Sequence, residues 1–129
     1  MLRRILIVDD EPAILMAVRT YLTTRQYEAD VAEDLETAES LLVANDYHAV
    51  ITDLRLSRRE GSEGLEIIRF VRENLPAAKT VLLTAYGSPK VEAEAKALGV
   101  DLYVQKPIAL SELERLLRVL LDPVEVVSD

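Results

Sequence analysis

Short runs of apolar residues alternate along the chain with longer segments in which apolar residues recur every three or four positions. Continuous apolar runs are typical of strands that are buried on both faces of a sheet. The periodic segments predict amphipathic helices, each with one apolar face. Strands that alternate with helices in this way predict a parallel sheet with helices on both faces, an α/β fold. Strands are expected at residues 5–8, 28–32, 48–52, 79–85 and 100–105, and helices at about 12–25, 35–42, 65–74, 89–98 and 111–120.

Local signals mark where several of these helices begin and end. Short polar side chains cap helix starts because they accept backbone N–H groups of the first turn. Proline favours the first helical position, and glycine favours the position just after the last. The expected signals are Asp10 or Glu11 before Pro12, Asp34, Ser88 before Pro89, Gly99 after the fourth helix, and a capping box of Ser111 with Glu114.

Polar and charged residues follow four of the five predicted strands. In an open parallel sheet, ligands bind at the carboxyl ends of the strands, so these residues are expected to form one cluster. Two like charges about 4 Å apart repel by ~1 kcal/mol in water and ~4 kcal/mol near a protein surface. A hard divalent cation such as Mg²⁺ would remove that repulsion. The residues are Asp9 and Asp10 after the first strand, Asp53 after the third, Thr84 at the end of the fourth and Lys106 after the fifth.

This set of side chains suits phosphoryl transfer. A carboxylate can attack phosphorus in line, while a metal ion and an ammonium group spread the charge that develops on the phosphoryl oxygens. A hydroxyl group can orient one of those oxygens. The sequence therefore predicts a carboxylate that accepts a phosphoryl group at this edge of the sheet.

The composition limits the kinds of binding partner and the cellular compartment that we expect for the chain. The chain has 129 residues, half of them hydrophobic, which suits one compact domain. A formal net charge of −8 disfavours direct binding to nucleic acid, because phosphate backbones are repelled. The absence of cysteine excludes disulfides and thiolate metal sites and fits a cytoplasmic location. No apolar run is long enough to cross a bilayer and no signal peptide is recognisable, so we expect no membrane association.

Four stretches, in this order, carry a resemblance to a known family: "ILIVDDEP", "HAVITDLRL", "VLLTAYG" and "LGVDLYVQKP". Together they resemble the receiver domain of two-component response regulators, in the superfamily of the chemotaxis regulators. The resemblance implies a flavodoxin-like, doubly wound (βα)5 sheet with strand order 2-1-3-4-5. It implies one receiver domain over residues 1–122, with 123–129 as a C-terminal tail or truncated linker.

The resemblance also implies a phospho-acceptor site. Asp53 is expected to accept a phosphoryl group from the phosphohistidine of a sensor histidine kinase or phosphotransfer protein. Asp10 is expected to bind Mg²⁺ directly and Asp9 partly through water, with further ligands from Asp53 and the backbone carbonyl of Arg55. The expected contacts of the phosphoryl group are Lys106, Thr84 and the backbone N–H of Ala85.

A switch is implied as well. Tyr103 is expected to rotate inward when Thr84 moves, which changes the face formed by the fourth helix, fifth strand and fifth helix. That face is expected to bind an effector domain or downstream protein, or to form a homodimer. The Lys106–Pro107 peptide is expected to be cis, and the ring of Tyr86 is expected to modulate loss of the phosphoryl group by hindering water. Such a domain phosphorylates itself and turns over no external substrate, so it is not an enzyme in the usual sense.

The chain departs from the family pattern after Asp53. The family often has a proline four residues on, where this chain has Ser57, and the start of the third helix, "GLEII", arrives about three residues late. We interpret this as a short basic insertion that contains Arg58 and Arg59.

Each residue taken singly has an ordinary structural explanation. Asp9 and Asp10 can cap a helix, Thr84 can be a strand residue, Lys106 can face solvent and Tyr103 can simply pack. Only their joint placement at strand ends favours the phospho-acceptor. The lone histidine, His48, is expected at the surface without a metal role.

Two other functions remain as alternatives. One is a degenerate receiver that acts only as a protein-interaction module. The other is an aspartyl-phosphate phosphatase, which would need a D-x-D motif where the first strand ends in Asp9, Asp10 and Glu11. A nucleotide-binding domain is remote, because no glycine-rich loop follows the first strand.

Overall fold

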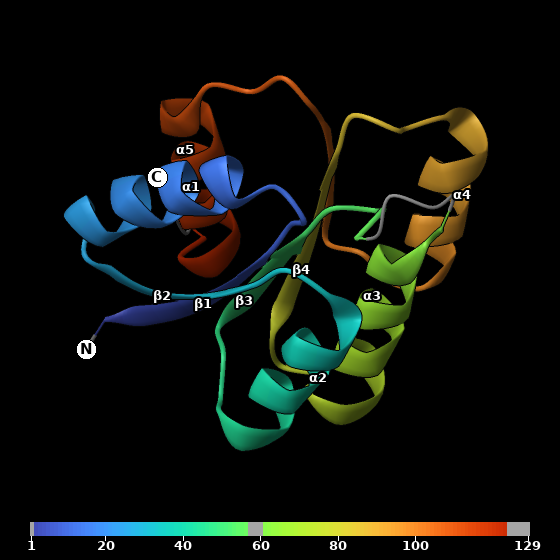
Figure 1. Ribbon diagram of the computed structural model, residues 1–129, viewed down its shortest axis with the longest axis horizontal. Coiled ribbons are helices and arrows are strands. Elements are labelled where there is room, and N and C mark those ends of the chain that lie inside the picture. Colours follow the sequence, from blue (N-terminus) through green and yellow to red (C-terminus); the bar gives the residue numbers. More distant parts are fainter. Residues whose placement is uncertain (1, 57–60, 124–129) are drawn as a thin grey trace, which may run out of the picture.

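Five strands and five helices alternate along the chain, as the hydrophobic pattern predicts. A computed structural model describes residues 2–56 and 61–123. Figure 1 shows the strands at the centre and the helices packed on both sides of them. The elements are β1 (Arg3–Val8), α1 (Pro12–Thr24), β2 (Tyr27–Ala32), α2 (Leu35–Ala44), β3 (Ala49–Thr52), α3 (Glu63–Asn74), β4 (Lys79–Thr84), α4 (Pro89–Ala97), β5 (Leu102–Gln105) and α5 (Leu110–Leu121).

All strands are parallel, and the sheet has the predicted order β2-β1-β3-β4-β5. The chain order reverses beside β1, which pairs with β2 on one side and β3 on the other. In this register Ile7 lies between Val31 and Ile51. The carboxyl ends of β1 and β3 therefore lie side by side at the switch point, where open α/β sheets bind ligands.

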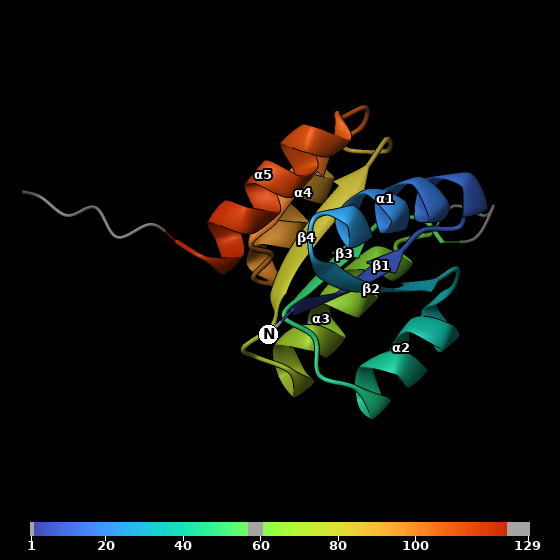
Figure 2. The ribbon, with the colours of Figure 1, turned by 90° about the vertical axis from the view of Figure 1, so that its left-hand side faces the viewer.

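Both faces of the sheet are covered, which explains the unbroken apolar run of β1. Ile5 and Ile7 pack toward α1 and α5, whereas Leu6 and Val8 pack toward α2 and α3. Figure 2 shows α1 and α5 on one side of the sheet and α2 and α3 on the other. A third apolar cluster joins α3 and α4 beside β4 and β5. The core thus holds the strand ends in fixed positions.

Most of the predicted helix signals are confirmed. Asp34 caps α2 by accepting the Thr37 N–H at 2.7 Å, and Ser88 caps α4 by accepting the Val91 N–H at 3.1 Å. Gly99 follows α4 with a left-handed φ of +89°. Glu11 occupies the N-cap position of α1, but its side chain makes no capping bond.

The predicted capping box of Ser111 with Glu114 is wrong. Helix α5 starts one residue earlier, at Leu110, and its N-cap is Ala109. Glu114 instead accepts a hydrogen bond from the Tyr27 hydroxyl at 3.1 Å. Tyr27, 87 residues away in sequence, thus binds the side chain that local spacing predicted to cap the helix start.

His48 is partly buried just before β3, and it is hydrogen-bonded to Arg4 of β1. The backbone N–H of His48 donates to the carbonyl of Arg4 at 2.8 Å, and the side-chain Nδ1 of His48 accepts the backbone N–H of Arg4 at 3.0 Å.

Among the helices in the described residues, none has the length and apolarity needed to cross a bilayer. The expected insertion at Ser57, Arg58 and Arg59, and all of the expected tail except Pro123, lie outside the described residues.

Candidate functional site

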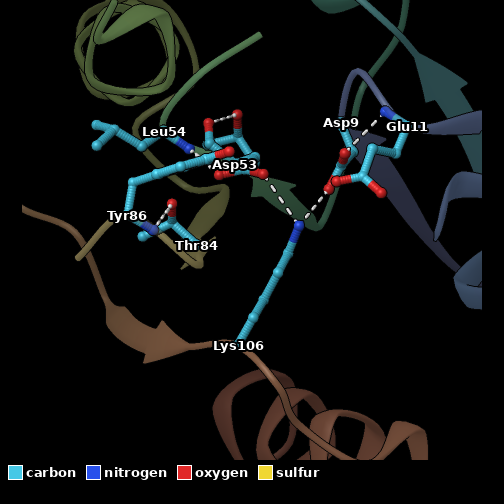
Figure 3. Close-up of polar contacts among 8 residues, drawn as sticks. Asp9, Glu11, Asp53, Leu54, Thr84, Tyr86 and Lys106 are labelled. Carbon is cyan, nitrogen blue, oxygen red and sulfur yellow. Dashed lines mark hydrogen bonds and ion pairs between the residues drawn. The ribbon is translucent and has the colours of Figure 1, made fainter. Parts of the chain in front are cut away.

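The predicted cluster forms at the carboxyl edge of the sheet. Strand β1 ends at Val8 and is followed by Asp9 and Asp10, while Asp53 directly follows β3 and Lys106 directly follows β5. Figure 3 shows Asp9 and Asp53 approaching the end of the Lys106 side chain from opposite sides. Three strand ends therefore contribute to one site.

Lys106 joins two buried carboxylates. Its Nζ lies 2.7 Å from Oδ2 of Asp9 and 3.0 Å from Oδ2 of Asp53. The two aspartates are only 3% and 4% exposed. Buried charges are costly unless they are paired and hydrogen-bonded, so the lysine offsets the desolvation of both acids. One cation serves two anions here, which leaves the cluster with a surplus of negative charge.

The pKa values of Asp9 and Lys106 reflect the same opposition between burial and charge pairing. Burial raises the pKa of Asp9 above its ordinary value of 3.8, although the hydrogen bond from Lys106 acts in the opposite direction. Burial also opposes the charged form of Lys106, but its hydrogen bonds to Asp9 and Asp53 and the charges of these acids outweigh burial and raise its pKa. Lys106 is therefore firmly cationic at neutral pH.

Backbone groups fix the other oxygens of both carboxylates. Oδ1 of Asp9 accepts the N–H of Glu11 at 3.0 Å, and Oδ1 of Asp53 accepts the N–H of Leu54 at 2.6 Å. The Thr52 hydroxyl donates to the Asp53 carbonyl at 2.9 Å. The Asp53 side chain is thus held between the backbone N–H of Leu54 and the ammonium group of Lys106.

Three carboxylates could hold a cation together. One oxygen each of Asp9, Asp10 and Asp53 lies within 4.8 Å of the other two. Ligands of Mg²⁺ lie about 2.1 Å from the ion, so opposite ligands are about 4.2 Å apart. Asp10 is partly buried, whereas Asp9 and Asp53 are buried. A set of hard oxygen donors at this spacing fits a small divalent cation.

Thr84 is fully buried at the end of β4, and its Oγ1 accepts the N–H of Tyr86 at 3.0 Å. Ala85 lies between them and is exposed. Tyr86 is 51% exposed, and the Arg55 guanidinium stacks on its ring with Cζ 4.1 Å from the ring centroid. This cation–π pair connects the loop after β3 with the loop after β4, beside the acid cluster.

Comparison with known proteins decides the family. The model of the response regulator receiver domain matches residues 5–118. The chain belongs to this family. It is therefore the signalling domain of a two-component response regulator.

Individual relatives agree with this assignment. Response regulator MprA of Mycobacterium sp. (strain KMS) is 34% identical over 118 residues, which are 92% of this chain and 50% of that protein. The photosynthetic apparatus regulatory protein RegA of Rhodobacter capsulatus is 29% identical over 111 residues, 86% of this chain and 59% of that protein. The receiver thus spans about half the length of the curated relatives that it matches.

Solved receiver structures have the same fold. A CheY-like receiver domain protein from Methanospirillum hungatei JF-1 superposes with a TM-score of 0.89 at 25% identity, and the match covers 95% of each chain. The response regulator TrrA of Thermotoga maritima, solved in complex with Mg²⁺-BeF, superposes with a TM-score of 0.79 at 34% identity. That match covers 93% of this chain and 100% of TrrA.

One further feature of this receiver matches a sequence-based expectation. The Lys106–Pro107 peptide is cis. Tyr103 lies on β5, partly buried, and packs against the apolar cluster that contains Leu82 and Ala95. Its hydroxyl lies against Gly87 in the loop after β4.

Sequence reasoning missed Gly64 as a residue that shapes the receiver site. A Cβ at this position would lie 2.8 Å from Cα of Leu54 and closer still to the carbonyl oxygen of Asp53. The Gly64 N–H donates to the Leu54 carbonyl at 2.9 Å. The first turn of α3 therefore lies directly against the backbone of Asp53. The "GLEII" stretch contains this glycine, but sequence alone does not say which backbone it meets.

Proposed function

We propose that this receiver accepts a phosphoryl group on Asp53 in a Mg²⁺-dependent reaction, with the phosphohistidine of a sensor histidine kinase or phosphotransfer protein as donor. One observation carries the proposal. The Asp53 carboxylate, buried at the switch point of the sheet, shares Lys106 with Asp9 and lies within reach of Asp10. The whole of residues 1–122 is proposed to act as this one domain.

In the proposed reaction, a carboxylate oxygen of Asp53 attacks phosphorus. An O–P bond forms while the P–N bond to the donor histidine breaks, and the electron pair of that bond stays on the imidazole nitrogen. Asp10, Asp9, Asp53 and the backbone carbonyl of Arg55 are the proposed ligands of Mg²⁺. When bound, the ion would neutralise charge on the carboxylates and on the phosphoryl oxygens.

Two side chains are proposed to contact the oxygens of the transferred phosphoryl group. The Lys106 ammonium, now 3.0 Å from Asp53 Oδ2, would pair with a phosphoryl oxygen instead. Oγ1 of Thr84 accepts the Tyr86 N–H, so its own hydroxyl proton is available for donation to a second phosphoryl oxygen. The N–H of Ala85 is proposed as a further donor.

The output of the reaction is proposed to be a population shift. A phosphoryl group adds about −1.5 to −2 charge and three strong acceptor oxygens, which draw Thr84 and Lys106 inward. Tyr103 then changes position, and with it the face formed by α4, β5 and α5. This face is proposed to bind an effector domain, a downstream protein or a second copy of the chain. No external substrate is turned over.

Incubation with Mg²⁺ and acetyl phosphate tests this proposal. Intact-mass measurement should show one added phosphoryl group that is stable in acid and lost in base. The Asp53→Asn variant should stay unmodified, while Asp46→Asn, an exposed acid between α2 and β3, should be modified like the wild type. An unmodified wild type would contradict the proposal and favour a receiver that only binds proteins.

A further inference from the structure

Thr52, the last residue of β3, places a hydroxyl group on the face of the sheet that α2 and α3 cover. Thr52 is fully buried, and Val50, two positions before it, packs in the apolar cluster of these helices. Side chains alternate between the two faces of a sheet, so Thr52 points to the same side as Val50. Valine would fill this position without burying a polar atom. A buried hydroxyl is costly unless it is hydrogen-bonded, so its partner indicates what it does.

That partner is the backbone carbonyl of Asp53. The Thr52 hydroxyl donates to this carbonyl at 2.9 Å. The carbonyl oxygen also lies against Gly64, where an added Cβ would overlap it. A hydrogen bond from β3 and the first turn of α3 therefore hold the carbonyl, and with it the peptide unit that joins Asp53 to Leu54.

The same peptide unit also holds the Asp53 carboxylate. The N–H of Leu54 donates to Oδ1 of Asp53 at 2.6 Å, while Oδ2 of Asp53 lies 3.0 Å from Nζ of Lys106. The C=O and N–H of one peptide unit turn together, because the unit is planar. A hydrogen bond to the carbonyl also polarises the unit and strengthens its N–H as a donor. The Thr52 hydroxyl therefore acts on Oδ1 of Asp53 through one peptide unit.

We propose that the Thr52 hydroxyl is a positioning group for phosphoryl transfer to Asp53. The hydroxyl fixes the peptide unit between Asp53 and Leu54, and this unit holds Oδ1, so that Oδ2 is the oxygen that attacks phosphorus. Thr52 does not touch the phosphoryl group and acts only through the backbone. The inference rests on the proposed function for the reaction, whereas the orientation of the carboxylate can be measured without it.

Three substitutions separate this role from general stability. Thr52→Val removes the hydroxyl and keeps the shape of the side chain, whereas Thr52→Ser keeps the hydroxyl. Thr80→Val is the matched control, because Thr80 is also a buried strand residue, near the start of β4, at the other end of the sheet from Asp53. Its hydroxyl donates to Oδ2 of Asp101 at 3.3 Å. Both valine variants thus lose one buried hydroxyl and its hydrogen bond.

The first measurement needs no phosphoryl group. In the full-length protein labelled with ¹⁵N, the amide proton of Leu54 should resonate far downfield, because it makes a short hydrogen bond to a carboxylate. In Thr52→Val this signal should move upfield, whereas in Thr52→Ser and Thr80→Val it should stay close to its wild-type position. A Leu54 signal that does not move in Thr52→Val would overturn the inference.

The second measurement is the initial rate of phosphorylation by acetyl phosphate and Mg²⁺, followed by intact mass at a temperature at which all variants are folded. Thr52→Val should react about three- to tenfold more slowly than the wild type, as expected for the loss of one hydrogen bond. Thr52→Ser should recover most of the rate, and Thr80→Val should react like the wild type. Equal slowing in the two valine variants would show an effect of stability alone and would overturn the inference.

Failure of the inference and failure of the proposed function are distinguishable. A wild type that takes up no phosphoryl group would overturn the proposed function, and the role of Thr52 would fall with it. An active wild type with an unchanged rate in Thr52→Val would overturn the role of Thr52 and leave the proposed function intact.

Discussion

The carbonyl oxygen of Asp53 occupies the space that a side chain at position 64 would need, so Gly64 lets helix α3 begin directly against Asp53. A Cβ at this position would also lie 2.8 Å from Cα of Leu54. Both neighbours are backbone atoms of the β3–α3 loop, which cannot rotate away as a side chain can. The third helix and the aspartate are thus positioned by one another.

Gly64→Ala should therefore be strongly destabilising. Because backbone must shift to admit the methyl group, we expect a loss of about 2 kcal/mol or more in the free energy of unfolding, measured by urea titration. Gly61→Ala is the matched control, since a Cβ there meets the carboxylate end of the flexible Glu63 side chain. Similar losses at the two positions would show that the contact with Asp53 is unimportant.

Removal of one carboxylate from the cluster should stabilise the metal-free protein. Asp10 has a carboxylate oxygen within 4.8 Å of Asp9 and Asp53, which already share Lys106, so Asp10→Asn relieves repulsion worth about 1 kcal/mol or more. We expect a higher thermal midpoint without Mg²⁺ and little further increase when Mg²⁺ is added.

The wild type should behave in the opposite way, with a lower midpoint that Mg²⁺ raises. Asp46→Asn removes one negative charge from an exposed position and should keep the Mg²⁺ response. If Asp10→Asn still gains stability from Mg²⁺ as the wild type does, Asp10 is not a ligand.

The stack of Arg55 on Tyr86 should lengthen the life of the phosphorylated state. The two side chains bridge the loops beside Asp53, the proposed acceptor, and the N–H of Tyr86 donates to Oγ1 of Thr84. A cation–π pair is worth about 0.5–1 kcal/mol, so Arg55→Ala and Tyr86→Ala should each speed dephosphorylation about two- to fivefold. Decay of the acyl phosphate is followed by intact mass.

Because the two side chains act as one pair, the double variant should be little faster than either single variant. Arg69→Ala, an exposed arginine on α3, should leave the decay unchanged. Independent, multiplying effects of Arg55→Ala and Tyr86→Ala would contradict a joint role.

Alkaline pH should destabilise the protein, in part because the Tyr27 hydroxyl loses its proton. Burial, together with its hydrogen bond to Glu114, raises the pKa of Tyr27 from 10.0 to about 12. The unfolded chain loses this proton at lower pH than the folded protein does. The stability contribution is therefore complete below pH 10 and is lost as the pH rises from 10 through about 12.

Urea unfolding midpoints measured across this pH range test the predicted contribution of Tyr27 to stability. Tyr27→Phe should lower stability at neutral pH and make the alkaline loss less steep, and Tyr47, whose pKa burial also raises, should account for part of the remainder. An unchanged slope in Tyr27→Phe would exclude this role for Tyr27.

The sequence predicts the sheet well because both of its faces are covered. Residues 5–8 of β1 and 49–51 of β3 are continuous apolar runs, and Asp34, Ser88 and Gly99 mark helix ends by local chemistry. The convergence of the site residues then follows from the order of the strands. These features depend on neighbours in sequence or on topology alone.

The features that were missed depend on contacts between distant segments. Glu114 has the spacing of a capping box, but Tyr27 lies close enough to bind it. Gly64 and Gly87 look like ordinary loop residues until the backbone of Asp53 and the ring of Tyr103 are placed beside them. Local pattern does not encode which atoms will fill such a space.

The claim that Asp53 takes up the phosphoryl group, rather than Asp9 or Asp10, is tested most directly by locating the modified residue. Borohydride reduces an acyl phosphate to an alcohol, so the phosphorylated aspartate becomes homoserine and is identified by peptide mass spectrometry. After treatment with acetyl phosphate and Mg²⁺, we predict homoserine at position 53 alone, and none when Mg²⁺ is chelated. Homoserine at position 9 or 10, or a phosphorylated protein without homoserine at position 53, would contradict the account.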